Sequence, residues 1–317
     1  MSHDESRTSG KEEPRQPQRI ERYSYRSFDR QYILADNRLG DFLRPTLWEA
    51  HSNSQVYLSS LLTKPLGTRP ALTACAQLPD LDYFSGRRAK DVIPFFRDAA
   101  GKEPNILPGI LESLAKSYRR KVSAEDFLAY VYGILAHPAF TERYADELTS
   151  RELRVPITTD ASFFIQARDV GAKLLWLHTY GERFVSKDRP RGQLPKGKAR
   201  STKPVSGSKD QYPADYRYDE ETKTLTVGDG AFSPVDPDVY NFEVSGLKVV
   251  QSWLGYRMKK PKGKKSSPLD EILPEKWTGD FTTELLELLW ILEATIELYP
   301  IQAKLLSEVA KKRTLRL

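Results

Sequence analysis

The sequence predicts a mixed α and β (α+β) fold, with a β-rich N-terminal part, a helical middle and a β-hairpin portion closed by a C-terminal helix. Three patterns indicate this order. Short apolar runs between Tyr23 and Phe96 are separated by turn residues, which is typical of strands. Apolar residues in 105–180 recur every three or four positions, which is typical of helices. After the first basic stretch apolar and polar residues alternate, and a leucine stripe at helical spacing follows.

The chain length allows one large domain or two smaller ones, because 317 residues with 39% hydrophobic content can bury a substantial core. Residues 1–19 are polar and contain Pro14 and Pro17, so we expect a disordered tail. The remainder divides into a β-rich and then helical part over 20–180, a basic flexible loop over 181–212, and a hairpin portion with a C-terminal helix over 213–317.

Three short apolar runs are the candidate strands of the N-terminal part. They are Tyr32–Leu34, Gln55–Leu58 and Ala71–Gln77. Gly, Pro and Asn residues separate them and supply the turns.

The helix boundaries are clearest in the middle of the chain. Ser123 and Asp126 have the spacing of a capping box, in which each side chain accepts a hydrogen bond from the backbone of the other residue. This box begins a helix that Pro138 ends, with an apolar stripe of Phe127, Leu128, Val131 and Leu135. A short second helix over 140–148 and a third helix from Ser162 follow.

The period-two segments predict strands. Tyr216–Tyr218 and Thr222–Val227 form a hairpin across 219–221. Residues 242–250 form a second strand pair or a bulged strand.

The last strong element is a helix from about Thr283 to Leu298, whose leucines share one face. Pro300 is expected to interrupt it, because proline removes a helical hydrogen bond. Residues 303–312 then predict one more short helix.

Cysteine content and hydropathy limit the class of protein. The single Cys75 excludes an internal disulfide framework, and its apolar neighbours predict a buried residue in a reducing compartment. No apolar run reaches the ~20 residues that cross a bilayer, and the N-terminus lacks the hydrophobic core of a signal peptide. We therefore expect a soluble cytoplasmic protein without a membrane partner.

No catalytic or cofactor-binding motif is recognisable. Glycine-rich phosphate loops, a Gly-x-Ser-x-Gly elbow and the Asn/Asp-Pro-Pro-aromatic segment of amino-methyltransferases are missing. Four histidines and one cysteine form no cluster at metal-ligand spacing, and His137 and His178 are interpreted as structural. We expect no catalysis, no metal and no cofactor.

Two lysine- and arginine-rich stretches carry the strongest functional signal. Residues 183–209 contain nine basic residues and 257–265 contain six. Pro, Gly and Ser within both argue against a continuous helix or strand. Because flexible cations neutralise successive phosphates, we expect double-stranded DNA as the partner. On charge alone a solvated surface loop fits equally well, since the net charge is only +6.

The cations are expected to divide into two kinds of contact. Lysines in 196–203 suit phosphates, whereas Arg189, Arg191, Arg200 or Arg257 are candidates for guanine edges. For Arg257 a structural ion pair is an equally weighted alternative. The complete candidate DNA-binding set is Arg183, Lys187, Arg189, Arg191, Lys196, Lys198, Arg200, Lys203, Arg257, Lys259, Lys260, Lys262, Lys264 and Lys265.

Several segments together resemble a known family. The string Tyr25-Arg-Ser-Phe-Asp-Arg30 resembles a Tyr-Arg-Pro-Phe-Asp signature, with Ser27 in place of proline, and 130–140 resembles a Tyr-x-Tyr-x-x-Leu-His-x-Pro segment. Further matching segments follow in order, namely 154–156, 171–178, 240–246, 253–257 and 267–270. Over roughly 20–300 the chain resembles the C-terminal specificity (target-recognition) domain of type ISP, LlaBIII-like, restriction-modification enzymes.

The resemblance implies a non-catalytic module that recognises a DNA sequence for an adenine methyltransferase and a translocase-nuclease. The matching motifs are interpreted as structural, so no DNA contact is assigned to them. We expect the module to act with a separate adenine methyltransferase and translocase, as when it completes a split enzyme in trans. The alternatives are a module that acts alone, a remnant, a structural docking subunit that adds nothing to DNA affinity, and an enzyme with an unfamiliar site.

Overall fold

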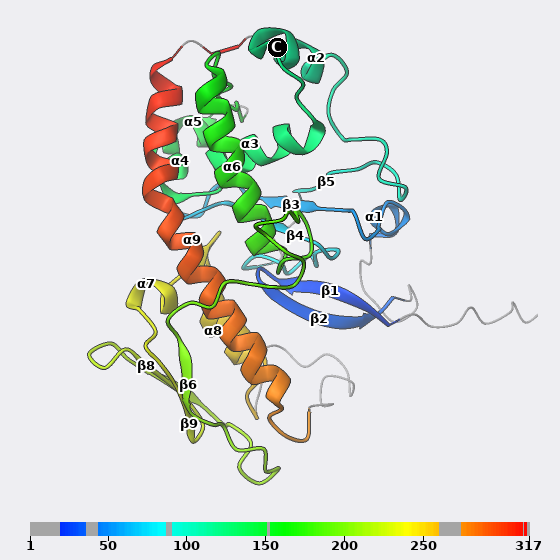
Figure 1. Ribbon diagram of the computed structural model, residues 1–317. Helices are drawn as coiled ribbons and strands as arrows, with labels where there is room; N and C mark the ends of the chain where they lie inside the picture. The colour runs from blue at the N-terminus through cyan, green and yellow to red at the C-terminus, as the bar shows by residue number, and fades with distance from the viewer. Residues whose placement is uncertain are drawn as a thin grey trace, which may run out of the picture.

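The computed structural model describes residues 20–35, 44–86, 91–150, 153–259, 274–312 and 314–315. The molecule is elongated and has two lobes, with one long helix, α9, running along both (Figure 1). The upper lobe contains a small sheet and most of the helices, and the lower lobe contains a four-stranded sheet. This order of β-rich start, helical middle, hairpin portion and C-terminal helix confirms the predicted fold class.

The N-terminal part is built from short antiparallel strands. One hairpin pairs β1 (Ile20–Arg26) with β2 (Asp29–Leu34). A second sheet has the order β4-β3-β5, and its central strand is buried along most of its length. Its elements are β3 (Tyr57–Ser60), β4 (Leu72–Cys75) and β5 (Asp91–Pro94), with the short helix α1 (Pro45–Glu49) before them.

Five helices form the middle of the chain, namely α2 (Ile110–Tyr118), α3 (Ala124–Leu135), α4 (Pro138–Arg143), α5 (Ala145–Ser150) and α6 (Ala161–His178). The predicted capping box is present. The Ser123 hydroxyl accepts from the Asp126 amide and the Asp126 carboxylate accepts from the Ser123 amide, each at 3.1 Å. The third helix begins one residue earlier than expected, because Asp160 caps it by accepting from the amides of Ser162 and Phe163.

Helices α3 and α6 touch through their backbones. A Cβ atom added at Gly171 would overlap the Ala129 carbonyl oxygen, and one added at Gly133 would overlap the Ala167 carbonyl oxygen. These two glycines let the helix axes approach more closely than side chains would allow. The contact fixes α6, from whose C-terminal end the first basic stretch begins.

The lower lobe is organised by one antiparallel sheet of order β6-β9-β8-β7. Its strands are β6 (Arg200–Lys203), β7 (Tyr216–Asp219), β8 (Thr224–Val227) and β9 (Gly230–Ser233). The predicted hairpin of 216–227 is confirmed. The segment 181–212, which we expected to be a flexible loop, contains an edge strand, because β6 pairs with β9.

Residues 242–250 form less strand than predicted. β10 (Glu243–Val244) and β11 (Leu247–Lys248) pair across Ser245 and Gly246, which both have positive φ, as a two-residue hairpin turn requires. From Val249 the chain forms a helix instead, α8 (Val249–Gly255), whose apolar residues are buried. The short helix α7 (Pro237–Tyr240) precedes this hairpin.

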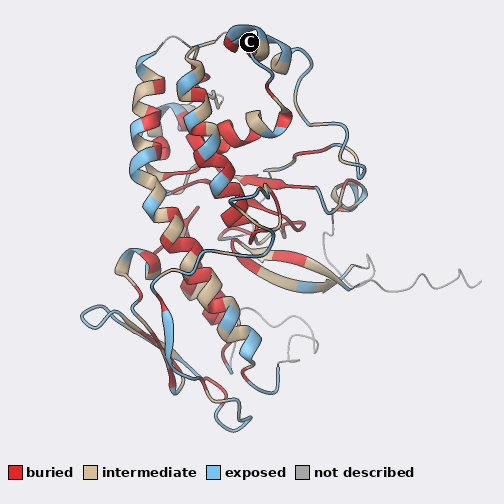
Figure 2. Cartoon of the chain, viewed as in Figure 1, coloured by how far each residue is buried: buried red, intermediate tan, exposed pale blue. Residues whose placement is uncertain are grey.

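Helix α9 (Gly279–Lys311) continues through Pro300, so the predicted interruption is wrong. Proline in a helix interior costs about 3 kcal/mol. Packing on both sides offsets this cost, because Leu292 before the proline and Leu305 after it are buried, while Pro300 itself faces solvent. Figure 2 shows the buried stripe along α9. Among the described helices, none combines the length and apolar character that a membrane span needs.

Candidate nucleic-acid interface

A deeply buried ion pair joins two of the segments that resemble the family, 25–30 and 253–257. The Arg257 guanidinium contacts both carboxylate oxygens of Asp29, at 2.8 Å and 3.2 Å. Its plane lies over the Trp253 ring, 3.8 Å from the ring centre, and Glu284 is 3.6 Å away. Arg257 is 5% and Asp29 1% exposed, so neither side chain reaches solvent. Arg257 therefore forms a structural ion pair, which was the alternative to a base contact.

The other residues of the string 25–30 also face inward. Arg26 donates to the Phe84 carbonyl at 3.0 Å and to the Tyr256 hydroxyl at 2.7 Å. Phe28 has a positive φ of 63° and packs edge-on against the His178 ring. Arg30 pairs with Glu287 at 3.0 Å. This segment joins the β1–β2 hairpin to both lobes and presents no cation for a ligand.

Arg183 is likewise internal, although it begins the first basic stretch. Its Nε donates to the Gln55 carbonyl at 2.9 Å, and a terminal nitrogen lies 3.5 Å from the Ala76 carbonyl. The side chain is 7% exposed, and burial lowers the pKa of Arg183. The arginine thus ties the end of α6 to the upper sheet.

The candidate cations consequently divide into three groups. Arg183 and Arg257 are buried, and Arg189 is half-buried. The exposed members are Lys187, Arg191, Lys196, Lys198, Arg200, Lys203 and Lys259. Lys260, Lys262, Lys264 and Lys265 lie outside the described residues. Of the described candidates, those in the exposed group have side chains that are open to a polyanion.

Residues 184–192, which we call the 184–192 turn, form an ordered projection at the lower end of α6. Ser186 and Arg189 exchange two backbone hydrogen bonds, of 3.0 Å and 3.1 Å, so Lys187 and Asp188 occupy the tip. The Gly192 amide donates to the Gly181 carbonyl at 3.1 Å, and Trp176 donates from its ring nitrogen to the Pro190 carbonyl at 3.2 Å. The turn is therefore closed at its tip and at its base.

The segment after this turn lies against α9. The Glu293 carboxylate accepts from the amides of Lys198 and Ala199, at 2.6 Å and 3.3 Å. The Trp290 ring nitrogen donates to the Ala199 carbonyl at 2.8 Å. These bonds hold the backbone of Lys198 and Ala199 against α9. The side chain of Lys196, two residues earlier, is exposed.

Lys198 and Lys223 share the Asp236 carboxylate. Lys198 lies 3.3 Å and Lys223 2.6 Å from its oxygens. The hydrogen bond from Lys223 lowers the pKa of Asp236, and the hydrogen bond to Asp236 raises the pKa of Lys198. Two cations around one carboxylate leave a net positive charge at this point of the surface.

The four-stranded sheet has one buried and one open face. Pairing places Phe232, Leu225 and Tyr218 in one row, and the first two are fully buried. The neighbouring row, which we call the outer row, contains Lys203, Ala231, Thr226 and Arg217 and is exposed or half-buried. Figure 2 shows the edge strand β6 as exposed. In the outer row the small side chains of Ala231 and Thr226 thus lie between those of Lys203 and Arg217.

His137 and His178 are buried in the core. His178 lies between the Tyr132 hydroxyl at 2.6 Å and the Thr295 hydroxyl at 3.0 Å, and burial lowers the pKa of His178 to about 3. Burial also lowers the pKa of His137 to about 4. Within the described ranges, no group of three or more His, Cys, Asp or Glu side chains is placed to hold a metal ion.

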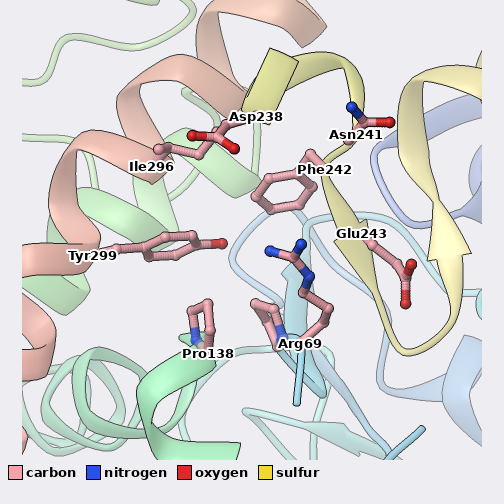
Figure 3. A pocket seen from close by; sticks show the side chains of 9 residues that line it. Arg69, Pro138, Asp238, Asn241, Phe242, Glu243, Ile296 and Tyr299 are labelled. Carbon is pink, nitrogen blue, oxygen red and sulfur yellow. The ribbon is translucent and has the colours of Figure 1, made fainter. Parts of the chain in front are cut away.

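A small polar pocket opens between the lobes (Figure 3). Arg69 points into it opposite Tyr299, and burial raises the pKa of the Tyr299 hydroxyl. Asp238 and Glu243 lie on its rim. None of the described candidate DNA-binding residues lines this pocket.

The family model of the type ISP C-terminal specificity domain matches residues 2–288. The chain belongs to this family. No curated protein matches its sequence. Among the solved structures that match, three show the same fold at 14–18% sequence identity.

The DrdV–DNA complex superimposes with a TM-score of 0.63 and 18% identity over 94% of this chain and 28% of that one. A nuclease-deletion mutant of the type ISP restriction-modification enzyme LlaGI, in complex with a DNA substrate mimic, gives 0.59 and 18% over 92% and 21%. The ATP-dependent type ISP enzyme LlaBIII bound to DNA gives 0.62 and 14% over 96% and 19%. The specificity domain thus spans less than a third of the length of each.

Proposed function

We propose that this specificity domain binds double-stranded DNA sequence-specifically and acts with a separate adenine methyltransferase and translocase. The observation that carries the proposal is the family match, together with three structural neighbours that are each described with bound DNA or a DNA mimic. The exposed cations of 187–203 supply the chemistry for phosphate contact.

The exposed cations of 187–203 lie on one continuous stretch of the chain. The chain runs from the 184–192 turn at the end of α6, past Lys196 and Lys198 beside α9, to Lys203 on β6. A path of this kind matches the way a duplex presents charge, with phosphates repeated along its length. Arg183 and Arg257 each bind a partner inside the protein, so neither is available to contact DNA. Their internal bonds give the surface a rigid base.

Binding of duplex DNA by the purified chain tests the proposal. With about six phosphate contacts the logarithm of the binding constant should fall against the logarithm of salt concentration with a slope of about −5. Selection from a randomised duplex library should enrich a defined sequence. Absence of binding at low salt would instead assign the chain to the docking-subunit alternative.

The catalytic part of the proposal has its own test. Labelled methyl donor and DNA should give no transfer with this chain alone, because the module itself is not catalytic. Addition of a type ISP enzyme whose own specificity domain has been deleted should yield methylation at the sequence that this chain selects. Transfer by the chain alone would contradict this part.

A further inference from the structure

We infer that the 184–192 turn is the element of the surface that distinguishes DNA sequences, with Lys187, Asp188 and Arg191 contacting base edges and Arg183 as a positioning residue. The inference rests on the proposed DNA binding and assigns sequence discrimination to one segment. The cations of 196–203 and of the outer row are assigned to phosphate contacts instead.

The first argument is the mixture of exposed chemistry. The turn presents a cation at Lys187, a carboxylate at Asp188, a cation at Arg191 and an apolar side chain at Val185, which is 44% exposed. Base edges require this mixture, since guanine offers acceptors, cytosine and adenine offer amino donors, and thymine offers a methyl group. Phosphates require only cations and hydrogen-bond donors.

Asp188 is the decisive residue. Its side chain is exposed. Burial lowers the pKa of the neighbouring Arg189 and the charge of Asp188 raises it, although no hydrogen bond or ion pair among the described residues joins the two. In the middle of a phosphate-binding stretch such a carboxylate repels DNA. It becomes favourable when it accepts a hydrogen bond from a base amino group, as Asp and Glu do with cytosine.

The second argument is rigidity. A contact that discriminates between bases needs a side chain held at a fixed position. The tip is closed by the two backbone bonds between Ser186 and Arg189, and the base is closed between Gly181 and Gly192. Trp176 of α6 holds the last part of the turn through the Pro190 carbonyl. Together these bonds tie the turn to the end of α6.

Arg183 completes this support from below. It donates to carbonyl groups of the segment 52–55 and of Ala76, so it couples the beginning of the turn to the upper sheet. The planar guanidinium makes these bonds in several directions at once, which a lysine ammonium does not reproduce in the same geometry. Arg183 is therefore a positioning residue, which affects base contacts only by holding the turn in place.

The test compares sequence selection by the wild-type chain with selection by Asp188→Asn and Lys187→Gln, using a randomised duplex library and sequencing of the bound fraction. Both side chains are exposed, so these variants keep the fold. Asp210→Asn is the matched control, because it makes the same charge change in another exposed loop. Asp188→Asn should relax selection at one or two base positions and weaken binding to the selected sequence about tenfold.

Each outcome has a distinct meaning. A uniform gain in affinity for all sequences with Asp188→Asn, equal to that of Asp210→Asn, would overturn the inference, because the carboxylate would then only repel phosphates. Failure of the wild-type chain to select any sequence would overturn the proposed function itself. Arg183→Lys should lower discrimination between selected and scrambled duplexes while the salt slope remains unchanged. A lower salt slope for this variant would instead make Arg183 a direct phosphate contact.

Discussion

Arg257 and Asp29 form a buried two-point ion pair although 228 positions separate them in the chain. Removal of one partner from such a pair leaves an unpaired charge in the interior and costs about 3–5 kcal/mol. We therefore expect Arg257→Ala to lower the free energy of unfolding by that amount, measured by urea denaturation. Lys259→Ala, two positions along and exposed, should leave it unchanged. An unaltered unfolding curve together with a loss of sequence preference would return Arg257 to the DNA-contacting set.

The double variant Lys196→Ala with Lys198→Ala should weaken binding to all duplexes about equally. Both side chains are exposed, and phosphate neutralisation does not depend on base sequence. The salt slope should fall by up to ~2 when binding constants are measured over a range of salt concentrations. Lys116→Ala with Lys304→Ala removes the same charge from the upper lobe and should change neither quantity. A loss restricted to one sequence would contradict the phosphate role.

Gly171→Ala should destabilise the fold, because the added methyl group would overlap the Ala129 carbonyl of the facing helix. Overpacking of this kind costs about 1–3 kcal/mol. Gly279→Ala is the control, since a Cβ there meets no atom within 4 Å. Thermal unfolding of the two variants measures the difference. Equal melting temperatures would show that α3 and α6 separate without loss of stability.

Acid should destabilise the protein partly through His178. Its folded pKa of about 3 lies below the ~6.5 of an unfolded histidine, so the unfolded state binds more protons between these values. Stability from this group is fully present above pH ~6.5 and falls by up to ~1.4 kcal/mol per pH unit below it. His178→Gln should flatten the pH dependence of the unfolding free energy by that slope. Parallel curves for variant and wild type would contradict the burial of a neutral His178.

Local patterns predicted the elements whose determinants are local. The capping box of Ser123 and Asp126 and the hairpin of 216–227 depend on residues a few positions apart, and both are confirmed. Helix α8 was missed because Val249 and Val250 favour strands by propensity, whereas their burial in the helix is decided by tertiary packing.

The sequence predicted which residue types make up the candidate interface, but not which of these side chains are exposed. A run of lysines and arginines does not reveal which members turn inward, because Gln55, which accepts from Arg183, and Asp29, which pairs with Arg257, lie more than a hundred positions away. The aromatic residues Trp253 and Tyr256, just before Arg257, were the available signal, since Trp253 stacks on its guanidinium. The 184–192 turn is held by Trp176 and Gly181, and no local sequence pattern links either residue to the turn.

Helix α9 determines how this protein can be cut and recombined. At about 50 Å it is long enough to serve both lobes. Its first half holds the segment before β6 through Trp290, and its second half reaches α3, where Gln302 donates to the Gly133 carbonyl. A chimera joined between the two lobes would separate one lobe from the part of α9 that packs against it. Exchange of target specificity between related enzymes therefore requires transplantation of the whole unit, with both crossover points outside 20–311.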